Sequence, residues 1–569
     1  MSVLTLNGLK AAEVPFVVQG PGVNTADFKV TVFASGLDFP NGIAELTDGS
    51  LIVTASDGSP SYFSGSGRLI RLVDSDGDGS ADGTPDVLYS GLAPTLTAVC
   101  TRSDLVFTTG NGTPLYIFRT DTDPSDTLSL VGQIDFDYSA SRNYHSHSGL
   151  TLRKSPGFEN RYDLFFQIGG EENFAESTDL VPISSGNVIN VSGSLARAAA
   201  HMMTLQDQGT HFEMVSVVQL ASGLRNASGF TIHPSFGDLW FHENGIDGLV
   251  DSNEPHSADE LNSIRFAEIG NGIHDFGFPD NYTAYRTDTV VGGEGIQPVI
   301  TFQPYGNPQT GLRSEGPNGI TFAPPGFPRG LNGGLFIGFH GKLFRGGLAN
   351  DENPVVYADP ETGDYFHFIK GQQTGIGHLI GLHASSDSLY VADVTTGGAL
   401  LDGAGEGCVY KIESLAPVLN APYRAWTGGT FTNPFNETDP EDNPDGDTLV
   451  NLLEFAFGTD PTSADVSALT WIDPVIIPGT PVVAHALPGE GTDYVARFLR
   501  RTDGSVSYAW RFSSDLTDWE CSTDAPSWYV TPTPIAMTID HELVEVPYPF
   551  LLDNGREARF FQVAVGLAP

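Results

Sequence analysis

One short sequence pattern occurs six times in this chain of 569 residues. Each copy begins with a small or acidic residue, continues with leucine, and then alternates apolar and other side chains as a β-strand does. The leucines stand at positions 51, 105, 164, 239, 335 and 389. Because one such strand cannot bury its faces alone, the copies are expected to pack against one another.

A second strand, entered through a turn, precedes each copy, and several copies are followed by a third strand that carries a basic residue near its end. The preceding strands read FPNGIAEL from Phe39, PTLTAV from Pro94, HSGLTL from His147, RNASGFTI from Arg225, GPNGITFA from Gly316 and GHLIGLHA from Gly377. Six copies of a three- or four-stranded meander predict a six-bladed β-propeller, in which each blade is buried against its neighbours.

The repeats and the composition divide the chain into five segments. We expect an N-terminal extension over 1–24, the propeller over 25–415, a linker rich in Pro, Asn, Gly and Thr over 416–434, a calcium loop with its helix over 435–462, and a small β-sandwich over 463–569. The last segment is predicted from short β patterns such as DYVARFLRR and ARFFQVAVG. The expected fold class is therefore all-β.

Charge limits the partners of this acidic protein. The 27 Lys and Arg residues against 70 Asp and Glu give a net charge of −43, which argues against binding nucleic acid, because a polyanion is held by clustered cations. No run of 18 apolar residues is present, so no transmembrane segment is expected. The first residues lack the features of a signal peptide, while the excess of carboxylates favours an extracellular or periplasmic location. The sequence does not indicate the oligomeric state.

Propeller geometry predicts where a ligand would bind, because the turns that enter the first strands meet at one mouth of the central channel. Aligning the six copies places Asn41, Thr95, His147, Arg225 with Asn226, Asn318, and His378 around this mouth. The ends of the second strands add Asp57, Asn111, Glu171, Asn244, His340 and Asp393. Side chains of these types also cap turns, so the set as a whole, rather than any single member, predicts a small-ligand site.

Two acidic loops have the spacing of calcium ligands. DSDGDGSADG places Asp74, Asp76, Asp78 and Asp82 at positions 1, 3, 5 and 9 of an EF-hand-like loop, with Pro85 at position 12. NPDGDTLVNLLE places Asn443, Asp445, Asp447, Asn451 and Glu454 at positions 1, 3, 5, 9 and 12. The alternative for each loop is a solvated acidic turn.

Several segments carry a family resemblance. GLRNASGFTIHPSFGDLWFHENGIDG, followed by ADELNSI and DFGFP, resembles the soluble quinoprotein glucose and sorbosone dehydrogenase family. HSGLTL with DLFFQIGG is similar to the family segment that opens with the catalytic histidine. GLFIGFHGKLFRGG and LIGLHASSDSLYVADVTTG resemble later segments of its sorbosone branch. The second acidic loop and the β segments after it resemble the calcium-loop and sandwich tails of many secreted bacterial proteins.

The resemblance implies an oxidoreductase that passes a hydride from a sugar, polyol or related alcohol to pyrroloquinoline quinone, with Ca²⁺ polarising the quinone and a further electron acceptor as partner. It implies that His147 is the catalytic base and Arg225 the clamp for the cofactor's carboxylates. For the cofactor, the resemblance also implies Asn226, Asn244, His340, Arg345 and His378, with Lys342 as a further cation. It implies the carbonyls of Gly245 and Ile246 as ligands of Ca²⁺. It implies Asp259, Glu260 and Asn262 as residues that brace a loop or bind a structural calcium.

Two alternatives remain open at the level of sequence. The family's proline after Arg-Asn is Ala227 here, and the arginine pair of the glucose-type last blade is absent. A propeller that has lost the cofactor and binds carbohydrate or protein is one alternative. The other is a calcium-dependent lactonase-type hydrolase, which would need carboxylates at the floor of the channel.

Overall fold

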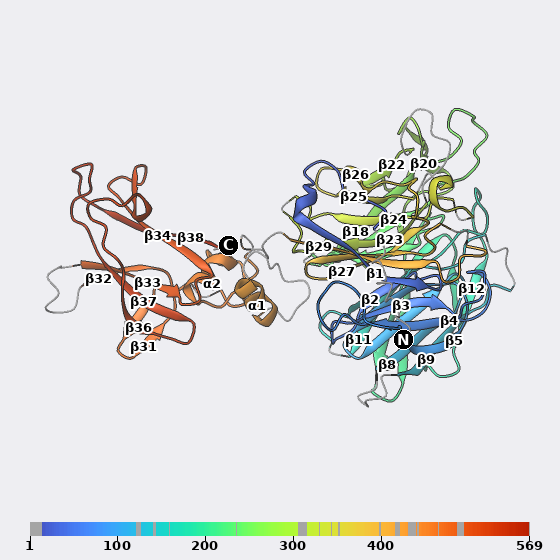
Figure 1. Cartoon of the computed structure of the whole chain (residues 1–569), viewed down its shortest axis with the longest axis horizontal. Coiled ribbons are helices and arrows are strands. Elements are labelled where there is room, and N and C mark those ends of the chain that lie inside the picture. The colour runs from blue at the N-terminus through green and yellow to red at the C-terminus, as the bar shows by residue number, and fades with distance from the viewer. Residues whose placement is uncertain are drawn as a thin grey trace, which may run out of the picture. The chain divides into compact units, whose positions relative to one another are not determined.

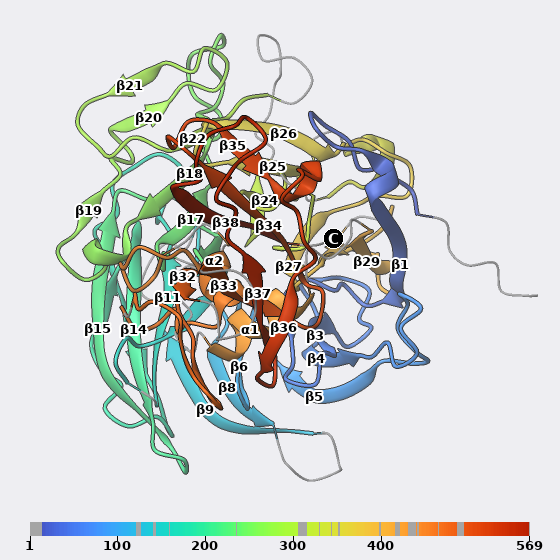
Figure 2. The same ribbon diagram turned by 90° about the vertical axis from the view of Figure 1, so that its left-hand side faces the viewer.

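Strands dominate the computed structural model of the chain (Figures 1 and 2), which confirms the predicted all-β class. The structure describes residues 14–120, 127–139, 144–158, 160–234, 236–304, 316–328, 330–342, 344–350, 353–397, 400–415, 421–430, 440, 443–464, 466–485 and 494–567. Contacts divide the chain into two compact units, one over Met1–His233 and Gly237–Ala416, the other over Pro234–Phe236 and Pro417–Pro569.

Six largely antiparallel sheets make up most of the first unit. The first sheet consists of β2 (Ile43–Glu45), β3 (Leu51–Ser56), β4 (Gly67–Leu72) and β5 (Asp86–Leu92). The second consists of β6 (Leu96–Arg102), β7 (Leu105–Gly110), β8 (Leu115–Thr120) and β9 (Leu128–Phe136). The third consists of β10 (Thr151–Lys154), β11 (Arg161–Ile168), β14 (Ala199–Asp207) and β15 (Phe212–Ser222). The fourth sheet consists of β16 (Gly229–Ile232), β17 (Leu239–Glu243), β18 (Asp259–Ile264) and β22 (Ile300–Phe302). The fifth consists of β23 (Pro317–Phe322), β24 (Leu335–Phe339), β25 (Val355–Asp359) and β26 (Asp364–Ile369). The sixth consists of β27 (Leu379–Ala384), β28 (Ser388–Asp393), β29 (Gly407–Ser414) and β1 (Phe28–Leu37).

The shorter strands of this unit extend these sheets or form a separate hairpin. They are β12 (Leu180–Ser184) and β13 (Ser194–Ala196) beside β9, β19 (His274–Asp275) parallel to β15, and the hairpin of β20 (Asn281–Thr283) and β21 (Val290–Gly292). Short 3₁₀ turns lie at Thr25–Asp27, Phe266–Glu268 and Gly347–Ala349.

All six copies of the leucine pattern form the second strands of the six sheets, as the sequence predicts. Five of these strands, β3, β7, β17, β24 and β28, are buried along their whole length. A strand that is covered on both faces carries few polar side chains, which explains why each copy is so rich in apolar residues. The third strands β4, β8 and β29 coincide with the predicted segments that carry a basic residue.

The six sheets close into a ring. Their first strands contact one another in the order β2, β6, β10, β16, β23, β27 and back to β2. A hydrophobic cluster fills each of the six interfaces between neighbouring sheets. The last sheet joins both ends of the ring, because β1 pairs with β29 from Phe28 opposite Ser414 to Leu37 opposite Gly407 (Figure 1).

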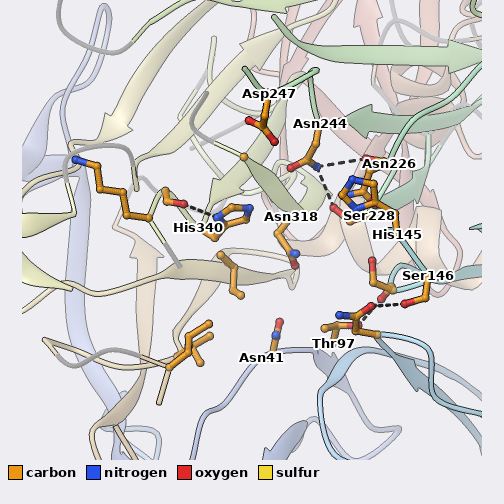
Figure 3. A pocket seen from close by; sticks show the side chains of 18 of the residues that line it. Asn41, Thr97, His145, Ser146, Asn226, Ser228, Asn244, Asp247, Asn318 and His340 are labelled. Carbon is orange, nitrogen blue, oxygen red and sulfur yellow. Dashed lines mark hydrogen bonds between the residues drawn. The ribbon is translucent and has the colours of Figure 1, made fainter. Parts of the chain in front are cut away.

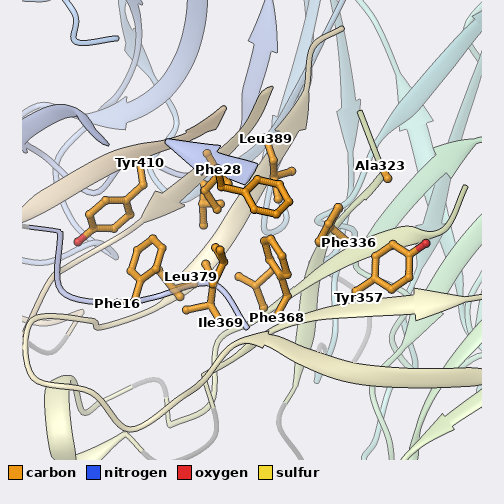
Figure 4. Close-up of a cluster of buried hydrophobic side chains, with 14 of the residues drawn as sticks. Phe16, Phe28, Ala323, Phe336, Tyr357, Phe368, Ile369, Leu379, Leu389 and Tyr410 are labelled. Atoms are coloured by element: carbon orange, nitrogen blue, oxygen red, sulfur yellow. The ribbon is translucent and has the colours of Figure 1, made fainter. Parts of the chain in front are cut away.

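The N-terminal segment takes part in this packing. Figure 4 shows the cluster between the β23–β26 sheet and the sheet that ends in β1, where Phe28 lies near Phe336 and Phe368. Phe16, from the segment predicted to be an extension, packs its ring against Tyr410 with the ring centroids 4.9 Å apart. Phe16 and Val18 therefore belong to the core of the first unit, whereas residues 1–13 lie outside the described residues.

Glycines allow the first strands to approach one another around the axis of the ring. A Cβ atom on Gly319 would lie 1.9 Å from the carbonyl oxygen of Ile380 in the next first strand, and one on Gly381 would lie 1.8 Å from that of Asn41. Gly42, Gly149 and Gly229 are crowded by the next first strand in the same way. Ala98 stands at the corresponding position of β6. These five glycines are needed for the close approach of the backbones.

The second unit packs two sheets and a helix around its own core. The sheets are β32 (Val482–His485), β33 (Tyr494–Arg501), β37 (His541–Pro547) and β36 (Thr533–Met537), and β35 (Trp519–Cys521), β34 (Val506–Ser513) and β38 (Phe560–Leu567). The hairpin of β30 (Thr470–Ile472) and β31 (Val475–Ile477), the 3₁₀ turn Ser522–Asp524, and the helices α1 (Ala421–Thr430) and α2 (Asn451–Phe457) complete the unit.

The helix α2 ends at Gly458, which adopts a left-handed conformation with φ 74°, as is common after a helix. Its Phe455 packs in one cluster with Phe498 of one sheet and Phe512 of the other. The segment predicted to be a linker, 416–434, contains α1, and its remaining residues lie outside the described ones. Within the described ranges, the helices are all too short or too polar to span a bilayer.

The crowding at Gly319 leads to a stability prediction. We expect Gly319→Ala to lower the free energy of unfolding by about 1–3 kcal/mol, because the new methyl group must displace the backbone of β27. Gly333→Ala is the matched control, since a Cβ there has no atom within 4 Å. Denaturant unfolding of both variants tests this, and equal stability of the two would contradict a tightly closed ring.

Candidate functional site

A cavity of about 830 Å³ opens where the six first strands begin. In each of the six sheets, one lining residue directly precedes the glycine, or in β6 the alanine Ala98, at which the first strands approach one another. We call these six residues the floor. The floor residues are Asn41, Thr97, Ser148, Ser228, Asn318 and Ile380. A narrower cavity of about 260 Å³ runs between the first strands and shares four of these residues. The floor therefore lies at the mouth of a channel between the first strands, and Figure 3 shows Asn41 and Asn318 pointing toward one another across it.

The floor corrects the predicted set of residues at the mouth. Asn41 and Asn318 line the cavity as predicted. In the other sheets the floor residue stands later in the sequence than the predicted one. The floor residue is Thr97 rather than Thr95, Ser148 rather than His147, and Ile380 rather than His378, whereas Ser228 lines the cavity together with the predicted Arg225 and Asn226. Successive residues of an extended chain point to opposite faces, so the side chain of His147 points away from the cavity that its neighbour Ser148 lines.

His147, the predicted catalytic base, is a core residue with 1% of its surface exposed. Its Nδ1 lies 2.6 Å from the Tyr138 hydroxyl, and its Nε2 lies 2.7 Å from the carbonyl oxygen of Thr113. Burial lowers the pKa of His147 to about 4. Because both ring nitrogens have protein partners and the ring does not line the cavity, His147 is not placed to accept a proton from a substrate.

His145, two residues earlier, lines the cavity instead. Its Nε2 is buried and has no hydrogen-bond partner among the described residues. Burial, together with the positive charges of Arg225 and Arg197, lowers the pKa of His145 to about 3. Arg197 also holds the backbone here, since its Nη2 donates to the His145 carbonyl oxygen over 2.9 Å. His145 is thus a neutral imidazole whose Nε2 is available to a ligand, and its low pKa makes it a weak base.

Arg225 lines the cavity, as predicted, but its guanidinium already has partners. Its Nη2 donates to Oδ2 of Asp247 over 2.9 Å and to Oδ1 of Asn173 over 2.6 Å. Its Nε donates to the Asn173 carbonyl oxygen over 3.0 Å. With 2% of the side chain exposed, Arg225 is held in one orientation, and Asp247 balances part of its charge.

Asn173 joins the two loops that flank Arg225. Besides accepting from Arg225, its Oδ1 accepts from the backbone N–H of Asp247 over 3.1 Å, and its Nδ2 donates to the Asp247 carbonyl oxygen over 2.6 Å. Nothing in the sequence around EENFAES pointed to this role, because the contact joins residues 74 positions apart. Asn173 is therefore a positioning residue for Arg225 that sequence reasoning missed.

The other predicted cofactor residues separate into two groups. Asn226, Asn244 and His340 line the cavity, as does Lys342. Asn244 braces the wall, because its Nδ2 donates to the Pro317 carbonyl oxygen over 2.9 Å.

Two predicted residues lie elsewhere. Arg345 is exposed and outside the lining, and His378 is fully buried beneath the turn that Asp393 holds. The Nδ1 of His378 lies 2.8 Å from the carbonyl oxygen of His340. Neither residue is placed to contact a ligand in the cavity.

A second, very small cavity of about 20 Å³ lies beside Arg225. Glu243 and Glu260, which face each other across β17 and β18, both line it. Asn281 also lines it, and its buried Oδ1 has no hydrogen-bond partner among the described residues. Burial, with the charge of Glu260, raises the pKa of Glu243 well above its ordinary value, and burial raises the pKa of Glu260 to about 7. Two buried carboxylates and an amide oxygen around a space of this size suit a divalent cation.

The predicted calcium carbonyls lie beside this small cavity, which Gly245 and Ile246 also line. The Ile246 carbonyl oxygen accepts from the backbone N–H of Ser257 over 3.0 Å. The N–H of Gly245 donates to Oδ1 of Asp259 over 2.8 Å. The side chains of Glu243 and Glu260 add two candidate cation ligands to these two predicted carbonyls.

The first acidic loop mainly binds its own backbone. Both carboxylate oxygens of Asp74 accept loop N–H groups, and Asp82 accepts from the backbone N–H and the hydroxyl of Ser75. Carboxylate oxygens of Asp74, Asp76 and Asp78 lie within 4.8 Å of one another. The Nζ of Lys29 donates to the Asp78 carbonyl oxygen over 2.9 Å, so a side-chain cation already lies against the loop.

The second acidic loop brings three carboxylates together. Oxygens of Asp445, Asp447 and Glu454 lie within 4.8 Å of one another, and Glu454 is fully buried on α2. Asn443 shapes the loop, because its Oδ1 accepts from the Gly446 N–H and its Nδ2 donates to the Asp447 carbonyl oxygen. Asn451, the predicted ligand at position 9, is fully buried at the first position of α2.

Comparison with known proteins gives only distant likenesses. The chain matches no protein-family model, and no curated protein matches it. One similar structure is the calcium structure of the carbohydrate-active enzyme of family AA12 from Trichoderma reesei (TM-score 0.47, 15% identity, 71% of this chain and 99% of that one). Another is the holo form of the pyranose dehydrogenase PQQ domain from Coprinopsis cinerea (TM-score 0.43, 16% identity, 71% of this chain and 98% of that one). A third is the PQQ-bound form of the aldose sugar dehydrogenase from Streptomyces coelicolor (TM-score 0.40, 16% identity, 68% of this chain and 98% of that one). With TM-scores below 0.5, these likenesses carry no argument about this chain.

The two neighbouring histidines are expected to differ in their effect on stability. His147→Ala should lower the free energy of unfolding by about 1–3 kcal/mol, because it leaves buried partners of the ring unsatisfied. His145→Ala should change it far less, since the Nε2 of His145 has no partner to lose. Denaturant unfolding at neutral pH measures both. A larger loss for His145→Ala than for His147→Ala would contradict this assignment.

Proposed function

We propose that the first unit is a six-bladed β-propeller that oxidises a sugar or related alcohol with pyrroloquinoline quinone as the hydride acceptor. The observation that carries the proposal is the buried, unpartnered Nε2 of His145 in a cavity that is also lined by Arg225 and Lys342. The closed ring of six sheets supports the blade count. The family resemblance of the sequence motifs supplies the class of reaction.

The cavity residues fit the proposed cofactor in their chemistry. Arg225 and Lys342 are cations suited to carboxylate groups, and the amides of Asn226 and Asn318 supply uncharged donors and acceptors. Among the described residues that line the cavity, Asp247 is the one carboxylate, and it is paired with Arg225. When bound, pyrroloquinoline quinone would supply the two-electron acceptor.

The mechanism assigns the proton to His145. Oxidation of an alcohol to a carbonyl removes a hydride from carbon and a proton from the hydroxyl group, and the Nε2 of His145 would take that proton. Burial, with the charges of Arg225 and Arg197, lowers the pKa of His145 and keeps the imidazole neutral before the step. Asn173 and Asp247 hold the guanidinium of Arg225 in place. A further acceptor must then remove the electrons.

Calcium completes the proposal at two places. We propose that Glu243, Glu260 and Asn281 hold Ca²⁺ beneath Arg225, where a cation would offset the cost of burying two carboxylates. In the second unit, we propose that Asp445, Asp447 and Glu454 hold another Ca²⁺ beside what we propose to be a β-sandwich. Such loops fill with calcium outside cells, which agrees with the expected extracellular or periplasmic location.

The alternatives receive less support from the site. A calcium-dependent lactonase would need carboxylates at the channel floor, and none of the six floor residues is acidic. A propeller that binds carbohydrate or protein without catalysis would have no need for an available imidazole nitrogen in the cavity. This binding role is the outcome that remains if the quinone is not bound.

Replacing His145 tests the proposed reaction. In calcium-loaded protein with the quinone added, we expect His145→Ala to lower sugar-dependent dye reduction by about 10²–10⁴-fold, which is the usual contribution of a general base. Asn332→Ala, at an exposed amide outside the cavity, is the control. Wild-type turnover in His145→Ala would exclude this residue as the base.

The pH dependence follows from the same residue. The base form of His145 is lost only as pH falls through its lowered pKa of about 3. Therefore kcat/KM should stay level from about pH 7 to pH 5, a range over which a histidine with an ordinary pKa of about 6.5 would lose most of its base form. Initial rates across this range test it, with fluorescence reporting that the protein stays folded. A fall centred near pH 6.5 would contradict the assignment.

Calcium binding can be counted by equilibrium dialysis. We expect two tight equivalents in the wild type and one fewer in each of Glu260→Gln and Asp447→Asn, while the exposed control Glu361→Gln keeps both. Without calcium at alkaline pH, Glu260→Gln should be more stable than the wild type, because it removes the repulsion between two buried carboxylates. Two equivalents retained in Glu260→Gln would exclude the proposed site beneath Arg225.

A further inference from the structure

Asp247 is the acidic residue of the cavity wall, and Figure 3 shows it beside Asn244. Among the described residues that line the cavity it is the one carboxylate. Its Oδ2 accepts from the Nη2 of Arg225 over 2.9 Å. The two side chains differ in exposure, since that of Asp247 is 56% exposed and that of Arg225 is 2% exposed. A solvated carboxylate is thus paired with a buried cation.

The fold holds the guanidinium of Arg225 without the help of Asp247. Asn173 accepts from it through the carbonyl oxygen over 3.0 Å and through Oδ1 over 2.6 Å. The Asn244 carbonyl oxygen accepts from Nη1 over 3.3 Å. Glu243 accepts from the backbone N–H of Arg225 rather than from the guanidinium. Among the described residues, Asp247 is therefore the one acid that binds the guanidinium itself.

The carboxylate of Asp247 can leave while its loop keeps its place. The backbone is anchored, because the N–H of Asp247 donates to Oδ1 of Asn173 over 3.1 Å and its carbonyl oxygen accepts from Nδ2 of Asn173 over 2.6 Å. The Oδ1 of Asp247 lies 3.7 Å from Nδ1 of His256, which is too far for a hydrogen bond. That Nδ1 accepts from the Gly248 N–H over 3.3 Å. A turn of the exposed Asp247 side chain into solvent therefore breaks only its pair with Arg225.

An anionic ligand must replace Asp247 at Arg225. A buried cation is costly without a counter-charge, and Asp247 supplies one when the cavity is empty. The apparent affinity for a ligand carboxylate is consequently reduced by the fraction of molecules in which Asp247 has turned away. The net charge of −43 adds a general repulsion of anions. A ligand with one carboxylate gains little from the exchange, whereas one with several can pair with Lys342 as well, which lines the same cavity.

We propose that Asp247 is a specificity-determining residue, which binds Arg225 as an internal carboxylate and is displaced only by a ligand with several carboxylates. In the loaded site, Asn173 and the Asn244 carbonyl oxygen keep the guanidinium in place, and the carboxylate of Asp247 lies in solvent. The inference deepens the proposed function and rests on it for the identity of the ligand, since pyrroloquinoline quinone is a tricarboxylate. The competition itself needs no oxidation of a sugar.

Isothermal titration of the full chain, loaded with calcium and dialysed free of the excess, tests the competition. The probes are pyrroloquinoline quinone and trimesate, a benzene ring with three carboxylates that cannot accept a hydride. Asp247→Asn removes the charge but keeps an oxygen for Arg225. We expect it to bind at least one probe about tenfold more tightly than the wild type does, because no internal anion has to be displaced.

The matched control is Asp251→Asn, which removes one charge from the same loop. Asp251 is exposed, and its carboxylate accepts from the Asn253 N–H over 2.8 Å. Because an exposed charge is screened by salt, this variant should change the affinity by less than about twofold. If Asp247→Asn fails to fold, Asp247→Ser decides by the same criterion.

Equal or weaker affinity of the folded Asp247 variant for both probes would overturn the proposal, and so would an equal gain in Asp251→Asn. Absence of binding of both probes to all the proteins would overturn it as well, because Arg225 would then receive no carboxylate. Tighter binding of trimesate without any binding of the quinone would support the role of Asp247 and count against the proposed function alone.

Discussion

The close approach of six β-strands around one axis is the constraint on which the first unit depends. At Gly319 and Gly381 the next strand lies so near that a methyl group would overlap its carbonyl oxygen. This approach closes the ring, and the six hydrophobic clusters between neighbouring sheets hold it closed. It also turns the residue before each crowded position toward one cavity. The floor of the site is thus a direct product of the packing that forms the fold.

Charged and uncharged side chains line different parts of the cavity. On one side burial, together with the charge of Arg225, lowers the pKa of His145 and keeps its imidazole neutral, and Asn173 and Asp247 hold Arg225 in place. At the floor all six side chains are uncharged. In a protein with a net charge of −43, these few cations are the local exception. The account therefore places anionic groups of a ligand near Arg225 and Lys342.

The repeats in the sequence predicted the six second strands and the strands before them, because strand patterns depend on local alternation and burial. The exact floor residues were harder to predict. The turns that enter the first strands differ in length, so an alignment on their turn residues predicts His147 where Ser148 faces the cavity. Alignment on the glycines of Asn-Gly and Ser-Gly would have found most of the floor. The roles of Asn173 and Glu243 depend on contacts between distant loops, and no local pattern reports those.

The most direct test of the central claim is a titration of the calcium-loaded chain with pyrroloquinoline quinone, followed by cofactor absorbance and then by dye reduction with neutral sugars. The account predicts one equivalent of quinone bound per chain and reduction that depends on the sugar. Absence of binding at micromolar quinone would contradict it, and would mean that Arg225, paired as it is with Asp247, cannot hold the cofactor's carboxylates.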